Sequence, residues 1–353
     1  MTCFQPKYIY IDKYQTIDDI YLKATKEEKQ LLRENLSIYS QKPSFKPHRG
    51  QWQLQIPCGN CLGCRLDHAN EWATRLYCER KYHKEACFVT LTYNNPNLPY
   101  TEKETPTLKK KDVQDFFKRL IKNKKIKGLK RFYCGEYGPK GGRPHYHTCI
   151  FGYIPKDLKI YKVNHRGDIL YKSKELQKIW GKGFVTIGEM NYETACYTAR
   201  YVQKKAGITP KTTIWTITTN EFGELERHKL KPHGKREEEF IEMSRKPGIG
   251  YQYWEDNKEI IKKQNGIMVK TKDGTKMKRL PRYYKKLWEK EDYNELEKYK
   301  TQWIKDGKQK IQEMLDKFDM QNLTDDQKIM HILKQQEETL KLKAKTLKRN
   351  NFI

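Results

Sequence analysis

The sequence predicts an α+β fold, in which an antiparallel sheet carries helices on one face and a helical C-terminal extension follows. Three observations support this prediction. Residues 88–93, FVTLTY, alternate and are rich in β-branched side chains, as expected of a central strand. Residues 131–153 read as two strands joined by a turn rich in Gly and Pro. The segments follow one another in the order β-α-β-β-α-β-α, which suggests an antiparallel sheet.

The N-terminal elements precede this core. Residues 7–11 form a β-prone run, and residues 52–56 are a second strand candidate. Between them, residues 16–39 are predicted to form a helix, because the first turn is acidic and so suits the helix dipole. A further amphipathic helix is expected to end near residue 83, since apolar residues recur at helical spacing at Leu66, Ala69, Ala73 and Leu76.

The core elements follow in order. The strand at residues 87–93 leads to a helix over residues 107–124, which has an apolar inner face and a lysine-rich outer face. The hairpin at 131–153 comes next. A short helix over residues 173–180 and a strand over residues 183–189 then lead to a helix within residues 191–205.

Beyond this core, residues 212–219 alternate like a strand and residues 227–236 are expected to be a basic loop. The final residues are rich in Lys, Glu, Gln and Leu, and Thr324-Asp-Asp-Gln327 is a capping-box signal for a helix. This helical tail can pack on the core, pair with a second copy or contact DNA. We therefore divide the chain into four segments: the N-terminal segment with the cysteine cluster (1–84), the core (85–210), a basic and aromatic extension (211–288) and the tail (289–353).

The composition points to a polyanionic partner. With 72 Lys and Arg residues against 44 Asp and Glu residues, the formal net charge is +28, and nucleic acid is the commonest partner for such an excess. The aromatic share of 12% excludes a disordered polyelectrolyte. A membrane surface would also attract this charge. The sequence shows no apolar run that could span a bilayer and no signal peptide, so we expect a soluble, cytoplasmic protein.

The hairpin carries a candidate metal site. His145 and His147 are two positions apart in the second strand, so their side chains project from the same face. Glu136 in the first strand returns to their level if the strands pair. This set suits a divalent ion that polarises a phosphate oxygen, typically Mg²⁺ or Mn²⁺. Taken alone, two histidines at this spacing could instead be structural.

Two tyrosines form a second candidate motif. Tyr197 and Tyr201 are four positions apart, and on a helix such residues share one face, so their phenol oxygens would reach the same point. Tyrosine is a poor nucleophile at its usual pKa of about 10. A metal on the phosphate or a nearby ammonium improves the attack, and Lys204 and Lys205 follow directly. A core stripe of Tyr, Ala and Val would also explain the spacing.

The cysteines suggest a metal rather than disulfides, since nine is an odd number and they are clustered. Cys58, Cys61 and Cys64 have the spacing C-x-x-C-x-x-C, which lets three thiolates converge on Zn²⁺ and leaves one tetrahedral position unfilled. Cys3 is the first candidate for the fourth ligand, because the N-terminal segment could fold back over the knuckle, and His68 is the second. A redox or iron–sulfur role and unliganded thiols remain alternatives.

These motifs together resemble the three motifs of the HUH endonuclease superfamily, in the order Phe88-Val-Thr-Leu-Thr-Tyr93, Gly142-Arg-Pro-His-Tyr-His147 and Tyr197-x-x-x-Tyr201-x-x-Lys204. Three further runs are similar to the replication initiation proteins of microviruses, in the gokushovirus branch: Pro57-Cys-Gly-Asn-Cys-Leu-Gly-Cys-Arg65, Cys134-Gly-Glu-Tyr-Gly138 and Met243-Ser-Arg-Lys-Pro-Gly-Ile-Gly250. The resemblance covers roughly residues 50–285 and implies a ferredoxin-like core with the histidines on a central strand.

The resemblance implies a viral rolling-circle replication initiator that nicks and joins single-stranded DNA at an origin. The metal would bind the scissile phosphate, and a tyrosine would attack it, leaving a 5′-phosphotyrosine link and a 3′-hydroxyl primer. Related one-tyrosine enzymes carry the nucleophile in a Tyr-x-x-Lys pattern, which Tyr201-Val-Gln-Lys204 matches, so Tyr201 is favoured as the first nucleophile. Lys204, or else Lys205, would neutralise phosphate charge or take part in proton transfer.

The implied partners are single-stranded DNA, the origin of the viral replicative form, and host polymerase and helicase, in the cytoplasm of a bacterial host cell. Basic residues beside these motifs are candidates for DNA contact: Arg143, Lys205, Arg245 and Lys246. The run around Arg245 could also be a plain turn with core aromatics nearby.

Two alternatives remain open. A plasmid replication initiator, conjugative relaxase or transposase would use the same chemistry, although the cysteine run and the SRKPGIG run argue against it. A non-enzymatic protein that binds zinc or nucleic acid would explain the charge. It does not explain why both histidines, the acid and both tyrosines occur together.

Overall fold

A computed structural model of the chain describes residues 3–4, 7–12, 51–59, 61–102, 104–138, 142–164, 167–200, 214–219, 225–230, 236–316 and 323–348. The chain divides into two compact units. The first comprises residues 1–67 and 315–347, and the second comprises residues 68–314 and 348–353. The first unit thus joins residues of the predicted N-terminal segment and of the predicted tail, which lie at opposite ends of the sequence.

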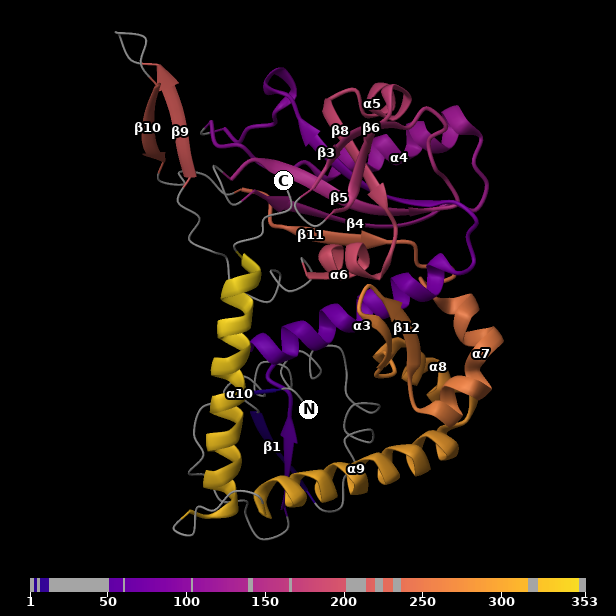
Figure 1. Cartoon of the computed structure of the whole chain (residues 1–353), viewed down its shortest axis with the longest axis vertical. Coiled ribbons are helices and arrows are strands. Elements are labelled where there is room, and N and C mark those ends of the chain that lie inside the picture. The colour runs from indigo at the N-terminus through magenta and orange to yellow at the C-terminus, as the bar shows by residue number, and fades with distance from the viewer. Residues whose placement is uncertain are drawn as a thin grey trace. The chain divides into compact units, whose positions relative to one another are not determined.

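The second unit is built on a seven-stranded sheet with the order β11-β4-β5-β3-β8-β7-β6 (Figure 1). Its strands are β3 (Ala86–Tyr93), β4 (Lys130–Tyr137), β5 (Pro144–Phe151), β6 (Lys159–Val163), β7 (Ile169–Lys172), β8 (Gly183–Glu189) and β11 (Phe240–Met243). Every neighbouring pair is antiparallel, which confirms the α+β class and the predicted hairpin. The sequence analysis missed β6, β7 and β11, because β6 is exposed throughout and the other two are only four residues long.

Alternation along the strands separates two cores. On one face, Val89 and Leu91 pack with helices α4 (Lys110–Lys124) and α5 (Lys174–Trp180). The inner face of α4 has the spacing that its sequence predicts, with Val113, Phe116, Phe117 and Leu120 buried. Removing a side chain of this size from water stabilises the fold by roughly 1.5–3 kcal/mol.

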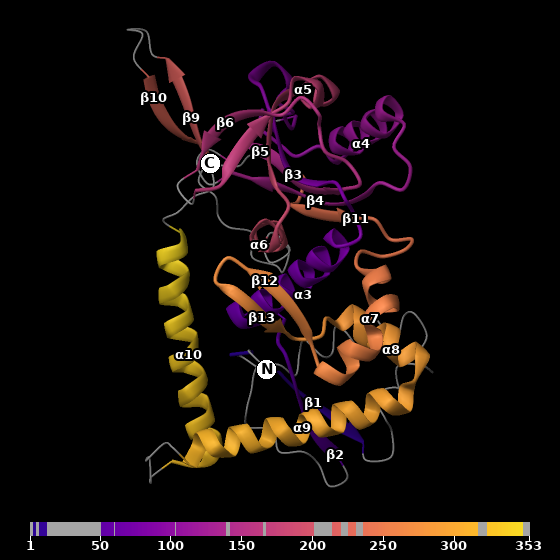
Figure 2. The same ribbon diagram turned by 45° about the vertical axis from the view of Figure 1, so that its right-hand side comes forward.

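The opposite face of the sheet is covered in part by two further helices, α3 (Leu62–Arg80) and α6 (Tyr192–Arg200). Phe88, Phe132 and Cys149 project from the sheet into this second core, where they pack with Ala73 and Ala195. Figure 2 shows α6 directly beside the sheet. The described structure therefore adds helices on a second face to the single helical layer that the sequence predicts.

The rest of the second unit consists of two hairpins and three helices: β9 (Ile214–Thr219) with β10 (Leu225–Leu230), β12 (Ile267–Thr271) with β13 (Gly274–Lys278), α7 (Tyr251–Gln264), α8 (Arg282–Glu291) and α9 (Tyr293–Asp316). A 3-10 turn, η2 (Asn95–Asn97), follows β3. The predicted basic loop over residues 227–236 is wrong at its start, because residues 225–230 pair with β9 along their whole length. Trp254 and Tyr284 are buried and stacked at 5.6 Å, so these aromatics belong to the core.

The first unit contains the hairpin of β1 (Lys7–Asp12) and β2 (Gln51–Ile56), which confirms both predicted strands, and the helix α10 (Asp325–Lys348). The predicted capping box opens α10. The backbone N–H of Thr324 donates to Oε1 of Gln327 at 2.9 Å, and that of Gln327 donates to Oγ1 of Thr324 at 3.4 Å. The predicted helix over residues 16–39 lies outside the described residues.

Where the chain is described, none of its helices combines the length and the apolar character that a membrane span requires.

Candidate active site

The register of the central strands brings the candidate metal ligands together. Glu136 in β4 lies opposite His145 in β5, and His145 lies opposite Thr92 in β3. Two positions further along β5, His147 lies opposite Thr90. Since opposed residues of antiparallel strands share a face, the carboxylate and both imidazoles project from the same side of the sheet.

A glycine shapes β4 at this point. Gly135 precedes Glu136 and faces the other side of the strand, where the ring of Phe240 packs. A Cβ atom added at Gly135 would lie 2.8 Å from that ring, which is closer than real Cβ contacts. The glycine of the Cys-Gly-Glu-Tyr-Gly run therefore lets the aromatic core approach the strand directly behind the carboxylate.

The two imidazole rings are aimed at one carboxylate oxygen. Nε2 of His145 lies 2.6 Å from Oε1 of Glu136, and Nε2 of His147 lies 3.0 Å from the same atom. Nδ1 of His145 donates to the carbonyl oxygen of Arg143 at 3.1 Å. Nδ1 of His147 is 3.0 Å from Oγ1 of Thr90.

These contacts test whether a metal fits. A neutral imidazole carries a single N–H, and in His145 the carbonyl of Arg143 takes it. Nε2 then presents a lone pair to the Glu136 carboxylate. Two acceptors that face each other need a cation or a proton between them, and bonding at Nδ1 is the usual way in which a metal-binding histidine is oriented. The ligand atoms of Glu136, His145 and His147 all lie within 4.8 Å of one another, so the set fits a divalent ion.

The carboxylate stays ionised although it is buried. Only 4% of Glu136 is exposed. Burial alone would raise the pKa of this carboxyl group, but the hydrogen bonds from His145 and His147 outweigh burial and hold the pKa of Glu136 well below its usual value. The site therefore offers a negative charge to a cation at neutral pH.

Helix α6 places a tyrosine beside the histidines. The Tyr197 ring lies 5.1 Å from the His147 ring at 84°, and 6.0 Å from the Phe88 ring at 90°. The helix is fastened to the histidine strand, since Oγ1 of Thr198 lies 3.5 Å from Sγ of Cys149. Tyr197 is half-buried in these contacts.

The other residues of the tyrosine motif lie outside the described residues: Tyr201, Lys204 and Lys205. The pair of tyrosines on one helical face and the lysine contacts to phosphate remain predictions.

The row of residues that includes Glu136 and His145 continues to an exposed aromatic ring. Thr92 lies opposite Phe184 in β8, so Phe184 shares the face of the histidines. Neighbouring strands are about 4.8 Å apart, which places the backbone of Phe184 about 10 Å from that of His145. Phe184 is 56% exposed, whereas the histidines are buried. The sheet face is therefore open on the side of β8.

The sequence analysis did not single out Thr90, Thr92 or Phe184 as site residues. Their alternation within two strands was visible in the sequence. Which residues they face depends on the strand register, which the alternation alone does not give.

Arg143, a predicted DNA contact, lies at the site but is engaged by the protein. Its Nη2 donates to the carbonyl oxygen of Tyr93 at 2.8 Å and to Oδ1 of Asn95 at 2.9 Å. These bonds brace the chain after β3 against the turn before β5. A guanidinium has further N–H groups that can still meet a phosphate.

Arg245 and Lys246, two other predicted DNA contacts, are exposed but are not brought to the histidines. They follow β11, whose last residue Met243 lies opposite Phe132. The pairing carries them away from Glu136 along β4, and at about 3.4 Å per residue the separation is about 20 Å. A role for them in DNA contact would therefore concern a strand well away from the candidate metal site.

A second group of candidate ligands lies in the first unit. The sulfur atoms of four cysteines lie within 4.8 Å of one another: Cys3, Cys58, Cys61 and Cys64. His68, the second candidate for the fourth ligand, is not part of this group. Across the described ranges of the chain, the cysteine group and the Glu136 group are the two places where three or more such ligand atoms converge.

Comparison with known proteins places these features in context. A family of replication-associated proteins of the ORF2 type matches residues 86–206. The chain is similar to the replication-associated protein ORF2 of Spiroplasma virus 4, with 33% identity over 260 residues that cover 72% of this chain and 73% of that protein.

Two further relatives are the replication-associated proteins VP4 of Bdellovibrio phage phiMH2K and ORF4 of Chlamydia phage 1. The first is 35% identical over 159 residues, 42% of this chain and 48% of that protein. The second is 34% identical over 165 residues, 44% of this chain and 39% of that protein. No solved structure matches the chain at a significant level.

Proposed function

The chain belongs to the replication-associated proteins of microviruses, the family that includes the Spiroplasma virus 4 protein, and from this membership we propose that it initiates rolling-circle replication. The proposed reaction is metal-dependent nicking and joining of single-stranded DNA at an origin, through a 5′-phosphotyrosine intermediate. The observation that carries the proposal is the convergence of two imidazole nitrogens and a carboxylate oxygen beside the Tyr197 ring.

The proposed partners follow from this reaction. They are single-stranded DNA, the origin of the viral replicative form, and the polymerase and helicase of a bacterial host, in whose cytoplasm replication would take place. The family membership argues against a plasmid initiator, a relaxase or a transposase.

Glu136, His145 and His147 would hold a divalent ion. When bound, the ion supplies positive charge at the non-bridging oxygens of the scissile phosphate. Mn²⁺ suits the mixed nitrogen and oxygen donors better than Mg²⁺, which prefers oxygen ligands. The carbonyl of Arg143 and the hydroxyl of Thr90 hold the imidazole rings in place through Nδ1, so they act as positioning groups.

The covalent step exchanges one phosphodiester bond for another. The phenol oxygen of a tyrosine attacks the phosphorus, a bond forms between them, and the bond from phosphorus to the 3′ oxygen breaks. The phenol loses its proton and the 3′ oxygen ends as a hydroxyl, so no nucleoside triphosphate is consumed. Packing against His147 and Phe88 limits the rotation of the Tyr197 ring and so orients its oxygen.

A second tyrosine allows the reaction to finish. Tyr201 is predicted on the same helical face as Tyr197 and would take one of the two cuts, with Lys204 or Lys205 meeting phosphate charge or moving a proton. After one round of synthesis, the free tyrosine cuts the regenerated origin. The new 3′ hydroxyl then attacks the first phosphotyrosine, which releases a closed circle.

The unpaired substrate strand would cross the open part of the sheet face toward β8. A base can stack on the exposed Phe184 ring while the phosphate beside it meets the metal ligands, since the two are about 10 Å apart. The strand must be unpaired at the cut, because bases within a duplex cannot be splayed over a protein face.

The experiment is a cleavage assay on labelled single-stranded origin DNA with Mn²⁺, Mg²⁺ or EDTA, resolved on a denaturing gel. We expect a covalent protein–DNA adduct with either metal and none with EDTA. His147→Ala should abolish the adduct, and so should the double variant Tyr197→Phe and Tyr201→Phe. The single variants establish which tyrosine acts first.

Tyr192→Phe is the matched control, since Tyr192 is on the same helix as Tyr197 but is buried in the core. It should form the adduct as the wild type does. Binding of DNA without any adduct, tested on fragments that span the whole parent genome, would overturn the proposal in favour of a non-enzymatic DNA-binding protein. An adduct that persists in the double variant would show that another residue is the nucleophile.

A further inference from the structure

We propose that the four-cysteine group is a structural zinc site, in which a single Zn²⁺ ties the N-terminal residues to the start of α3. The proposal concerns the first unit and does not depend on the nicking reaction. The four ligands would be Cys3, Cys58, Cys61 and Cys64.

The spacing of the sulfur atoms fits a zinc tetrahedron. Zn–S bonds are about 2.3 Å long, so the sulfurs at two corners of a regular tetrahedron are about 3.8 Å apart. Sγ of Cys58 lies 3.9 Å from Sγ of Cys64, and Sγ of Cys61 lies 3.9 Å from Sγ of Cys3. These two pairs involve all four residues and form opposite edges of the tetrahedron.

Backbone N–H groups stabilise the sulfurs as thiolates. The N–H of Cys58 donates to Sγ of Cys3 at 3.2 Å, and that of Cys61 donates to Sγ of Cys58 at 3.2 Å. Sγ of Cys61 accepts from the N–H of Cys64 at 3.5 Å and of Phe4 at 3.4 Å. Each such bond places positive charge beside a ligand that must lose its proton to bind zinc.

The local chain is built for this turn. Gly59 has a φ of +77°, a conformation that other residues rarely adopt, and it allows the chain to double back between Cys58 and Cys61. Helix α3 begins at Leu62, so Cys64 lies in its first turn. A zinc tetrathiolate carries a net charge of −2, which the positive end of a helix favours.

Other roles for the four cysteines fit less well. A disulfide needs sulfurs about 2.05 Å apart, and all four cysteines are free. An iron–sulfur cluster would lie among the four sulfurs and hold them further apart than a single ion does. A fully occupied tetrahedron leaves no position for substrate, so the site is structural and not catalytic.

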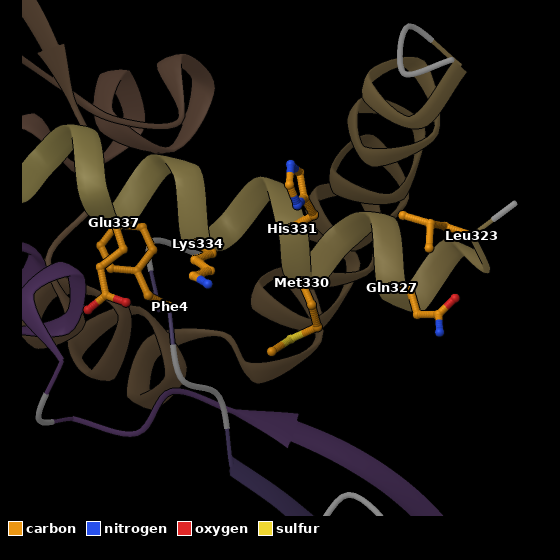
Figure 3. Close-up of a pocket in the computed structure, with 7 residues that line it drawn as sticks. All are labelled: Phe4, Leu323, Gln327, Met330, His331, Lys334 and Glu337. Carbon is orange, nitrogen blue, oxygen red and sulfur yellow. The ribbon is translucent and has the colours of Figure 1, made fainter. Parts of the chain in front are cut away.

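The site would connect segments that are far apart in the chain. Cys3 and Cys58 are separated by 55 positions, and Phe4 packs in the same buried cluster together with Leu333 and Leu340 of α10. Phe4 also lines a pocket whose other walls are residues at the start of α10 and just before it (Figure 3). Zinc would therefore fix Phe4 as well, and with it the contact between the chain start and α10.

The test measures zinc in the purified full-length protein after dialysis against EDTA. We expect about one tightly held zinc per chain, since structural tetrathiolate sites bind zinc strongly. His147→Ala should keep this zinc, which separates the site from the candidate active site. Cys196→Ser, a change at a half-buried cysteine on α6, is the matched control and should also keep it.

Substitution of Co²⁺ for zinc reports the ligands by visible absorption. The wild type should show the spectrum of four thiolates, and His68→Asn should leave it unchanged. Cys3→Ser should lose at least tenfold in zinc affinity. Because loss of a ligand can also impair folding in Cys3→Ser, Cys3→His is the second variant, and it should bind Co²⁺ with the shifted spectrum of three thiolates and one imidazole.

Wild-type protein that is folded and retains no metal would overturn the proposal. So would a Cys3→Ser protein with wild-type zinc affinity, a brown protein that contains iron and sulfide, or a disulfide between any two of the four cysteines in protein purified without oxidant. Loss of DNA nicking in a protein that retains its zinc would contradict the proposed function and leave this inference standing.

Discussion

Phe184 is the residue through which the sheet face reaches solvent. It shares a row with Thr92 and His145, and its ring is exposed although the histidines beside it are buried. An exposed ring next to a buried ionic cluster suits a base that stacks while its phosphate enters the site. The same ring would be unfavourable in water if nothing covered it during function.

Replacing Phe184 by Ala should weaken binding of single-stranded origin DNA by about 1–3 kcal/mol, the usual value for loss of one stacked base. At 25 °C this is roughly a 5- to 150-fold increase in Kd, measured by fluorescence anisotropy with His147→Ala as the background to prevent cleavage. Phe184→Trp should keep the affinity. Phe184→Leu keeps apolar area without an aromatic face, so affinity equal to wild type in this variant would argue against stacking.

Among the elements, α6 has the closest link to the proposed chemistry. Its first turn is closed by a reciprocal pair: Oδ1 of Asn191 accepts from the N–H of Thr194 at 2.9 Å, and Oγ1 of Thr194 accepts from the N–H of Asn191 at 2.9 Å. The helix is short, with nine residues. A short helix depends on its cap and its packing, because few of its own hydrogen bonds hold it.

Asn191→Ala should cost about 1 kcal/mol of stability, the usual value for loss of an N-cap, as measured by urea unfolding. It should also slow formation of the Tyr197 adduct in a Tyr201→Phe background, because the tyrosine is held less firmly beside His147. Asn191→Asp can still accept the bond and should behave like the wild type. If Asn191→Ala lowered stability and left the adduct rate unchanged, the helix end would have no part in positioning Tyr197.

Across the larger unit, a single buried carboxylate joins three distant parts of the chain. Glu79 of α3 lies 2.9 Å from Nζ of Lys130 in β4, and it accepts from the N–H of Gly250, just before α7, at 2.6 Å. Nε2 of His83 is 2.7 Å away. Burial raises the pKa of the Glu79 carboxyl, but these bonds outweigh burial, so the pKa lies below its usual value.

This shift predicts a pH dependence of stability. A carboxyl group whose pKa is lowered by folding stabilises the protein above its unfolded pKa of about 4.3, and the stabilisation is lost as pH falls through that value. Glu79→Gln should therefore unfold at lower urea concentration than the wild type at pH 7, with a loss of roughly 1.5–3 kcal/mol. The difference should narrow at pH 4.

Asp115→Asn is the control for this prediction, because Asp115 pairs with Lys111 at the surface of α4, where ion pairs contribute little. Its unfolding midpoint should stay close to that of the wild type at both pH values. A difference between Glu79→Gln and wild type that is equal at pH 7 and pH 4 would show that the charge of Glu79 is not what stabilises the unit.

The sequence by itself determined the features that depend on a few neighbouring residues. The two-residue period of a strand places His145 and His147 on one face wherever the strand lies, and the capping box at Thr324 and Gln327 opens α10 as predicted. Alternation and helical spacing were also sufficient for β3, α4 and the central hairpin, since backbone geometry sets these periods locally.

Only the tertiary structure decided which residues meet across the sheet and across the chain. Strand register aligned Thr90 with His147 and Phe184 with Thr92, and it carried Arg245 away from the histidines. Contact with Cys3 closed the cysteine group over 55 positions. Register and long-range contact depend on how the whole apolar surface packs, because shifting a strand by one residue turns all its side chains to the other face, and no local pattern contains that information.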